Sequence, residues 1–86
     1  MRILETAKFA RTRKKLADKG EIEALKAAIL AIVAEPLTGK KLHGELASLR
    51  TFAYSAHGQS RRLIYKFSAE EIVLFSFGPR QGIYKE

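Results

Sequence analysis

Cysteine and tryptophan are absent from the 86 residues, and histidine and proline occur only twice each. Because there is no thiol, disulfide scaffolds, thiolate zinc sites and cysteine nucleophiles are excluded. No apolar run approaches the roughly 18 residues that a membrane-spanning helix needs. The N-terminal MRILETAKFARTRKK also lacks the apolar core of a signal peptide. The composition therefore predicts a protein of the cytoplasm with no membrane partner.

Acidic side chains are too few to balance the basic ones. Sixteen Lys and Arg face nine Asp and Glu, which gives a formal net charge of +7. An excess this large in so small a chain is typical of proteins that bind a polyanion, although a merely soluble basic surface is the alternative. With 47% hydrophobic and 29% charged residues, the sequence predicts one globular domain over residues 1–86.

Residues of the usual catalytic constellations are also scarce. Two histidines without cysteine do not make a metal site, so no metal or cofactor is expected. His43 and His57 lie in loops, where an isolated histidine is more often inert than a proton carrier. The Gly39-Lys40-Lys41 segment lacks the earlier glycine and the following Ser or Thr of a phosphate-binding loop.

Hydrophobic periodicity predicts the elements and an α+β fold. Residues 2–6 form a strand that ends at Thr6 as a helix N-cap, and two helices follow over 7–16 and 21–34, the second announced by Asp18 and Glu21 at capping-box spacing. Period-two segments then predict strands over 49–55, 61–67 and 72–77, separated by turns at 56–59 and 68–71. The order is β-α-α-β-β-β, with a helical hairpin packed on an antiparallel sheet.

Alternation along the strands assigns side chains to two faces of that sheet. If the turn at 56–59 is tight, residues 54, 52 and 50 lie opposite 62, 64 and 66. One face then carries Arg50, Phe52, Tyr54, Arg62, Ile64 and Lys66. The other carries Leu49, Thr51, Ala53, Leu63, Tyr65 and Phe67, which is the better surface for the helices. Cations mixed with aromatics suit phosphate binding and base stacking, but an ordinary solvated face fits the pattern equally well.

Three short segments, in this order, carry a resemblance to a known family. They are KLHGEL at 41–46, RLIY at 62–65 and FGPRQGIYK at 77–85. The chain resembles the RelE/ParE superfamily of bacterial toxins, which has a K-L-x-G segment, an Arg-Leu-Val/Ile-Tyr strand, and a Gly-x-Arg followed shortly by a Tyr. The resemblance extends over essentially the whole chain. It implies a toxin of a type II toxin–antitoxin module, with an acidic antitoxin as partner and an assembly such as a toxin–antitoxin heterotetramer.

The RelE branch of this superfamily implies a ribosome-dependent mRNA endoribonuclease that needs no metal. In that branch the ribose 2′-hydroxyl attacks the adjacent phosphate and leaves a 2′,3′-cyclic phosphate and a 5′-hydroxyl. By motif position, Arg62 matches the strand arginine on the scissile phosphate, and Arg80 matches the second arginine, which acts on transition-state charge or the leaving oxygen. Tyr84 matches the tyrosine that stacks on a base or assists proton transfer. The resemblance places Arg50 where the preceding strand begins a basic pair.

Further residues are expected to contact RNA. On the sheet these are Arg50, Tyr54 and Lys66, and outside the proposed site they are Lys14 and Lys15 on a basic helix and Lys40 and Lys41 in a loop. The helix over 8–15 and the loop are expected to dock on ribosomal RNA phosphates.

The sequence departs from the RelE pattern on the strand before Arg62. The second basic position is occupied by Phe52, with Tyr54 beyond it, so the general base is not identified; His57 could substitute if the turn folds over the site. The ParE branch shares the fold, lacks this basic set and poisons DNA gyrase. Retention of Arg62, Arg80 and Tyr84 favours mRNA cleavage. A catalytically degenerate module that binds only antitoxin or nucleic acid is the third alternative.

Overall fold

The computed structural model describes residues 2–42, 44 and 48–79. The elements follow in the order β1 (Arg2–Glu5), α1 (Ala7–Lys15), α2 (Lys19–Ala34), the 3₁₀ helix η1 (Pro36–Thr38), β2 (Lys40–Lys41), β3 (Arg50–Ala56), β4 (Gln59–Phe67) and β5 (Glu71–Pro79). The predicted α+β fold is confirmed. The structure adds η1 and the two-residue strand β2 inside the stretch that the sequence leaves irregular.

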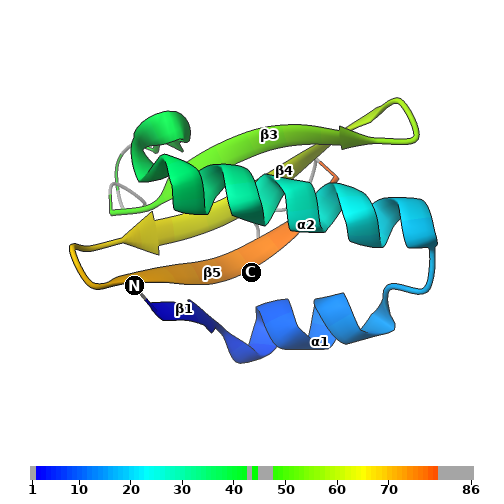
Figure 1. Ribbon diagram of the computed structural model, residues 1–86, viewed down its shortest axis with the longest axis horizontal. Helices are drawn as coiled ribbons and strands as arrows, with labels where there is room; N and C mark the ends of the chain where they lie inside the picture. Colours follow the sequence, from blue (N-terminus) through cyan, green and yellow to red (C-terminus); the bar gives the residue numbers. More distant parts are fainter. Residues whose placement is uncertain (1, 43, 45–47, 80–86) are drawn as a thin grey trace.

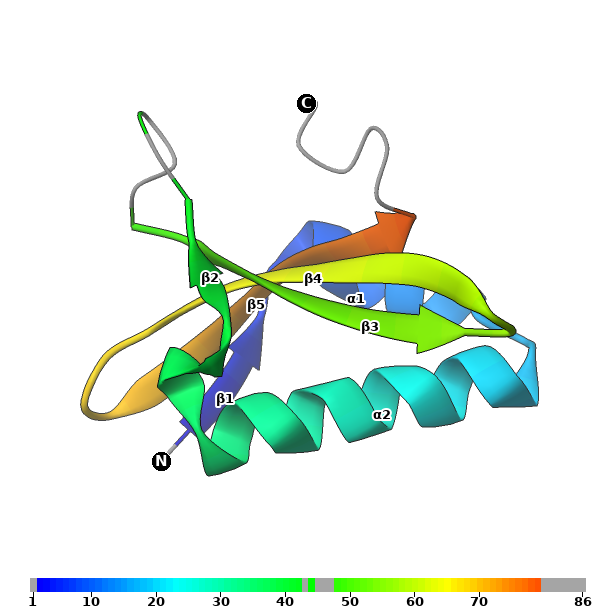
Figure 2. The ribbon, with the colours of Figure 1, turned by 90° about the horizontal axis from the view of Figure 1, so that it is seen from above.

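A five-stranded sheet in the order β1-β5-β4-β3-β2 forms one layer, and the two helices form the other (Figure 1, Figure 2). β3, β4 and β5 form the predicted antiparallel meander, and β2 pairs antiparallel with β3. β1 joins the other edge and runs parallel to β5, with Arg2 opposite Glu71 and Glu5 opposite Leu74. The first strand of the chain therefore pairs with the last.

Both helices begin where the sequence places their caps. The Thr6 hydroxyl accepts a hydrogen bond from the backbone N–H of Phe9, and the Asp18 carboxylate accepts one from that of Glu21. Each cap satisfies a donor that the first helical turn leaves without a partner. α2 starts two residues before the predicted position, at Lys19, because Asp18 is itself the cap.

The hydrophobic core fills the space between the helices and one face of the sheet. It consists of Phe9, Leu25, Ala28, Ile32, Leu63, Tyr65, Ile72, Leu74 and Phe77, and Phe52 and Tyr54 pack against it. The rings of Phe9 and Phe77 meet edge to face with their centroids 4.9 Å apart, which joins α1 to β5. The core therefore defines a helix face of the sheet.

A two-residue turn sets the register of β3 on β4, and this register corrects the predicted faces. His57 and Gly58 both have positive φ, at 54° and 75°, as a type I′ hairpin turn requires. The turn closes on the pair Ala56 and Gln59, so Tyr54 lies opposite Arg61, and not opposite Arg62 as predicted. A shift of one residue moves a whole strand to the other face.

The prediction of one face with Arg50, Phe52 and Tyr54 beside Arg62, Ile64 and Lys66 is therefore wrong. The first three side chains share the helix face with Leu63 and Tyr65, while the β4 residues lie on the opposite side. Thr51 and Ala53, expected beneath the helices, lie on that opposite side as well.

Tyr65 holds the segment after α2 against the sheet. Its ring is fully buried, and its hydroxyl donates to the carbonyl of Pro36 over 2.6 Å and accepts from the N–H of Gly39 over 3.0 Å. Arg50 donates to the carbonyl of Gly39 over 2.7 Å. Gly39 is required here because a β-carbon would collide with the Tyr65 phenol. These bonds fix η1 and, through it, the position of β2.

We predict that Tyr65→Phe lowers the free energy of unfolding by about 1–3 kcal/mol, because the N–H of Gly39 and the carbonyl of Pro36 lose a buried partner. Urea unfolding followed by circular dichroism measures the change. Tyr54→Phe is the matched control, since no hydrogen bond joins the Tyr54 hydroxyl to the described residues, and it should leave stability at neutral pH nearly unchanged. Equal losses in the two variants would contradict this role of the Tyr65 hydroxyl.

Candidate nucleic-acid interface

The sheet has a second face on which no described helix packs, here called the rear face. It carries Lys40 from β2, Thr51 and Ala53 from β3, Arg62, Ile64 and Lys66 from β4, and Val73, Ser76 and Gly78 from β5. Residues directly opposite each other on neighbouring strands point to the same side, so this set follows from the register alone. The rear face brings three of the predicted phosphate-binding cations together, Lys40, Arg62 and Lys66.

Arg62 is the arginine of the sheet that the fold leaves available. Within the described part of the chain, no carboxylate or carbonyl pairs with its guanidinium. Its neighbours directly opposite are Ala53 and Gly78, which have almost no side chain. Gly78 has a φ of 150°, a conformation that side-chain-bearing residues rarely adopt. Arg62 therefore stands on a low floor, with five donors open to a ligand.

The adjacent Arg61 is used by the fold instead. Its guanidinium binds the carboxylate of Glu21 on α2, with Nη2 and Oε2 2.7 Å apart, and both side chains are largely buried. This ion pair raises the pKa of Arg61, chiefly through the hydrogen bond that the guanidinium donates to Glu21. The two neighbouring arginines thus point to opposite faces, as strand alternation predicts.

Arg50 and Tyr54, which the sequence assigns to RNA contact, lie on the helix face. The Arg50 guanidinium is held by the Gly39 carbonyl and lies over the Phe67 ring, 5.5 Å from its centroid. Tyr54 packs against the core. Neither side chain shares a surface with Arg62, so neither joins a site built around it.

Lys66 and Lys40 flank Arg62 on the rear face at different distances. Lys66 lies four residues further along β4, about 13 Å away at the rise of a strand. Its ammonium lies over the Phe75 ring, 5.7 Å from the centroid. Lys40, expected in a loop away from the site, pairs with Thr51 and so faces the same side as Arg62; Lys41 pairs with Arg50 and faces the helix side.

His57 does not reach the rear face. Its Nε2 lies 2.8 Å from Oδ1 of Asp18, the cap of α2, and a β-carbon on Gly20 would lie 2.8 Å from its ring. The hydrogen bond with His57 lowers the pKa of the Asp18 carboxyl. The histidine therefore joins the hairpin turn to the helix layer, and its substitution for a general base at Arg62 is not supported.

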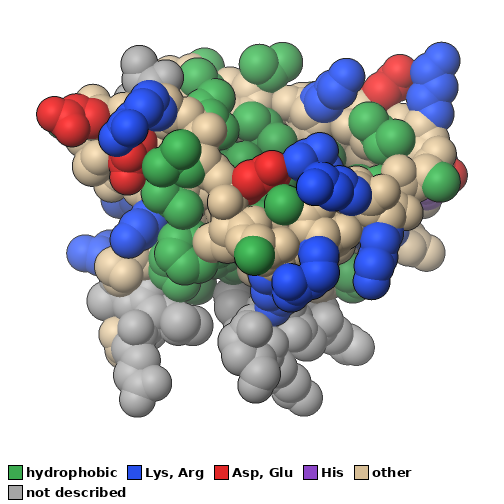
Figure 3. All heavy atoms as spheres, turned by 90° about the horizontal axis from the view of Figure 1, so that it is seen from below, with side chains coloured by type: hydrophobic (Ala, Val, Ile, Leu, Met, Phe, Trp, Pro, Cys, Tyr) green, Lys and Arg blue, Asp and Glu red, His purple; other side chains and the backbone are tan. Residues whose placement is uncertain are grey.

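A second basic surface lies on α1. Its exposed side chains include Arg11, Lys14 and Lys15, and only Arg13 is neutralised there, by Glu5 at 2.7 Å. Figure 3 looks onto the molecule from below Figure 1, where α1 is the lowest helix, and shows Lys and Arg side chains gathered over its middle. This surface is separate from the rear face.

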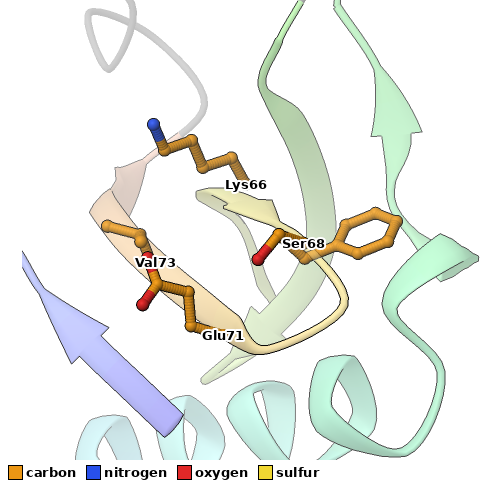
Figure 4. Close-up of a pocket in the computed structure, with 5 residues that line it drawn as sticks. Lys66, Ser68, Glu71 and Val73 are labelled. Atoms are coloured by element: carbon orange, nitrogen blue, oxygen red, sulfur yellow. The ribbon is translucent and has the colours of Figure 1, made fainter. Parts of the chain in front are cut away.

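A hollow of about 220 Å³ lies at the other end of the β4–β5 hairpin (Figure 4). Lys66, Phe67, Ser68, Glu71 and Val73 line it. Its acidic residue is already bound by Arg2, with Nη2 and Oε1 2.8 Å apart. With one ammonium and one neutralised carboxylate, the hollow offers no converging set of catalytic groups.

Two of the three residues that the sequence names as catalytic, Arg80 and Tyr84, lie outside the described residues, as does His43. β5 ends at Pro79, opposite Arg61, so the described chain stops at the same end of the sheet as Arg62 and the 57–58 turn. Across the described ranges, no cluster of three or more His, Asp and Glu could hold a metal ion. No helix within those ranges is long and apolar enough to cross a membrane.

The fold and the rear face together define a class of protein, a small basic α+β domain with an unpaired arginine on the helix-free side of its sheet. The same fold occurs in the intact RelBE toxin–antitoxin complex of E. coli, with a TM-score of 0.70 over 91% of this chain and 94% of that one, at 18% identity. It also occurs in the RelBE2 toxin–antitoxin complex of Mycobacterium tuberculosis, with a TM-score of 0.66 over 92% and 96% of the two chains, at 27% identity.

The chain belongs to the ParE-like toxins of type II bacterial toxin–antitoxin systems, whose sequence profile matches residues 3–86. No curated protein has significant sequence similarity to it. The family that the sequence motifs indicate is therefore confirmed, and the protein is a toxin of the RelE/ParE type.

Tyr54 provides a test of the helix face through its titration. Burial raises the pKa of its phenol to about 12, the Glu21 carboxylate adds to the rise, and the Arg61 guanidinium opposes it. A raised pKa in the folded state means that the stability from neutral Tyr54 is complete below pH ~10 and is lost as pH rises toward 12. We predict that the free energy of unfolding falls more steeply between pH 9 and pH 12 in wild type than in Tyr54→Phe, measured by urea unfolding. Identical slopes would place Tyr54 in solvent.

Proposed function

We propose that this toxin is a ribosome-dependent endoribonuclease that cleaves mRNA without a metal ion, with Arg62 on the scissile phosphate. The observation that carries the proposal is that Arg62, alone among the sheet arginines Arg50, Arg61 and Arg62, has no partner in the described fold and faces away from the helices. A protein seldom leaves an arginine unpaired on a low, small-residue floor unless a ligand supplies the acceptors.

The reaction needs charge stabilisation and two proton transfers. The ribose 2′-oxygen attacks the adjacent phosphorus and loses its proton, while the bond from phosphorus to the 5′-oxygen breaks and that oxygen gains a proton. The phosphate carries extra negative charge in the transition state, and a guanidinium presents a planar pair of N–H donors to two of its oxygens. By motif position, Arg80 supplies the second cation, and Tyr84 stacks on a base or assists a proton transfer.

An acidic antitoxin is the proposed partner. Both structural neighbours are toxin–antitoxin complexes, and a net charge of +7 favours an acidic protein. A disordered acidic segment that folds over the helices and sheet would neutralise the cations and stabilise a small domain by mass action. A toxin–antitoxin heterotetramer is one assembly that such a pair forms.

Inhibition of DNA gyrase is the second candidate, and one specific observation favours it. The rear face of β3 presents Thr51, Ala53 and Ser55, with no basic side chain beside Arg62. The RelE branch is expected to carry a basic pair on that strand, and the matching family is described as ParE-like. A catalytically inactive module that binds antitoxin or nucleic acid would have the same surface.

We predict that Arg62→Ala lowers the rate of mRNA cleavage by about 10²–10³, the usual loss when one donor to transition-state charge is removed. Primer extension on mRNA in a reconstituted translation reaction measures the cleavage. Arg62→Lys should restore only part of the rate, because an ammonium cannot reproduce a bidentate guanidinium. The melting temperature should stay near that of wild type.

Arg61→Ala is the matched control, one residue away on the same strand. It breaks a largely buried ion pair, so it should lower the melting temperature while purified, folded protein keeps its cleavage rate. Gyrase supercoiling is assayed on the same proteins. Intact mRNA together with blocked supercoiling would assign the gyrase function, and loss of neither activity in wild type would leave the binding module.

A second prediction concerns the basic surface of α1. Lys14→Ala combined with Lys15→Ala should weaken binding to 70S ribosomes and make log affinity less steep against log salt, by roughly 0.7 for each phosphate no longer bound if single-stranded RNA is contacted. Lys19→Ala combined with Lys26→Ala removes the same charge from exposed positions of α2 and is the control. Equal effects of the two double variants would reduce the role of α1 to net charge.

A further inference from the structure

Thr51 carries a polar group that the fold does not satisfy. Its hydroxyl oxygen is shielded from solvent and makes no hydrogen bond, and the residue as a whole is only 7% exposed. It is also the single buried side-chain nitrogen or oxygen in the described part of the chain without a partner. Burying a hydroxyl without a hydrogen bond costs free energy, so such a group calls for an explanation.

The position of Thr51 on the rear face suggests what the partner is. Lys40 lies directly opposite it on β2, and Ile64 directly opposite on β4. Arg62 is its diagonal neighbour across β3 and β4, at the about 7–8 Å typical of such pairs. Ser76 holds the corresponding diagonal position on the other side of Arg62. The unsatisfied hydroxyl thus lies between two cations, Lys40 and Arg62.

We infer that the Thr51 hydroxyl donates a hydrogen bond to the RNA strand that Arg62 anchors, at a phosphate oxygen of the strand as it passes from Arg62 toward Lys40. The inference rests on the proposed function, because the strand is the mRNA on which the toxin acts. Thr51 is a binding residue in this scheme and takes no proton.

A backbone phosphate fits this place better than another ligand class. Two cations and a hydroxyl donor match the acceptor-only oxygens of a phosphodiester, which repeats along a strand and can satisfy Arg62 and Lys40 with successive groups. Ile64, between Thr51 and Ser76, gives an apolar patch on which part of a nucleotide can rest. Because the hydroxyl is shielded in the free protein, the row from Thr51 to Ser76 must become uncovered as the strand binds.

The test is Thr51→Val, which replaces the hydroxyl by a methyl group of similar size. Removing an unsatisfied buried hydroxyl should leave the melting temperature equal or higher, whereas removing a structural hydrogen bond would lower it. In contrast, mRNA cleavage and affinity for ribosome-bound mRNA carrying a 2′-deoxynucleotide at the cleavage position should fall about 10- to 100-fold, the loss expected for a hydrogen bond to a charged group. Thr51→Ser keeps the hydroxyl and should recover most of both.

Ser55→Ala is the control, since Ser55 is an exposed hydroxyl on the same side of the same strand and should change neither quantity. Wild-type protein that cleaves mRNA while Thr51→Val cleaves and binds as well as wild type overturns the inference alone. A lower melting temperature with no rescue by Thr51→Ser also overturns it, because the hydroxyl is then structural. Wild-type protein that leaves ribosome-bound mRNA intact overturns the proposed function instead.

Discussion

The left-handed backbone at His57 and Gly58 decides which side of the sheet every residue of β3 faces. A type I′ turn has two central residues, so the strands it joins pair with an odd sum of residue numbers, and Tyr54 meets Arg61. The core accepts only this arrangement, because Phe52 and Tyr54 then join Leu63 and Tyr65 beneath the helices. The same turn brings Thr51 beside Arg62 on the rear face. Packing of the core and composition of the interface are thus set by one short segment.

Local patterns predicted much of the fold. The helix caps at Thr6 and Asp18 and the order of the elements follow from short-range chemistry, and the structure confirms them. The predicted faces failed because period-two alternation states which residues share a side of one strand but not how two strands are joined. The information was present in His57-Gly58, since a glycine at the second turn position indicates a type I′ turn. The parallel pairing of β1 with β5 had no local signal.

The site was predicted in part, for a related reason. Arg62 and Lys66 were placed on one face correctly, while Arg50 was grouped with them although it binds the Gly39 carbonyl. A cation used for structure and a cation left for a ligand have the same sequence pattern, and only their partners separate them. Thr51 was assigned to the core, and an unsatisfied hydroxyl has no sequence signature at all. The roles proposed for Arg80 and Tyr84 still depend on the motif.

The parallel pairing of β1 with β5 has a consequence for how the toxin is made. Residues 2 and 71 are neighbours in the sheet although 69 positions separate them, so the first strand to leave the ribosome waits for the last. β5 also supplies Ser76 and Gly78 beside Arg62 and much of the core against Phe9. Such long-range contacts form late in folding. A growing chain therefore cannot assemble the rear face while β5 is still inside the exit tunnel, and the ribosome that makes the toxin finishes before the toxin can fold.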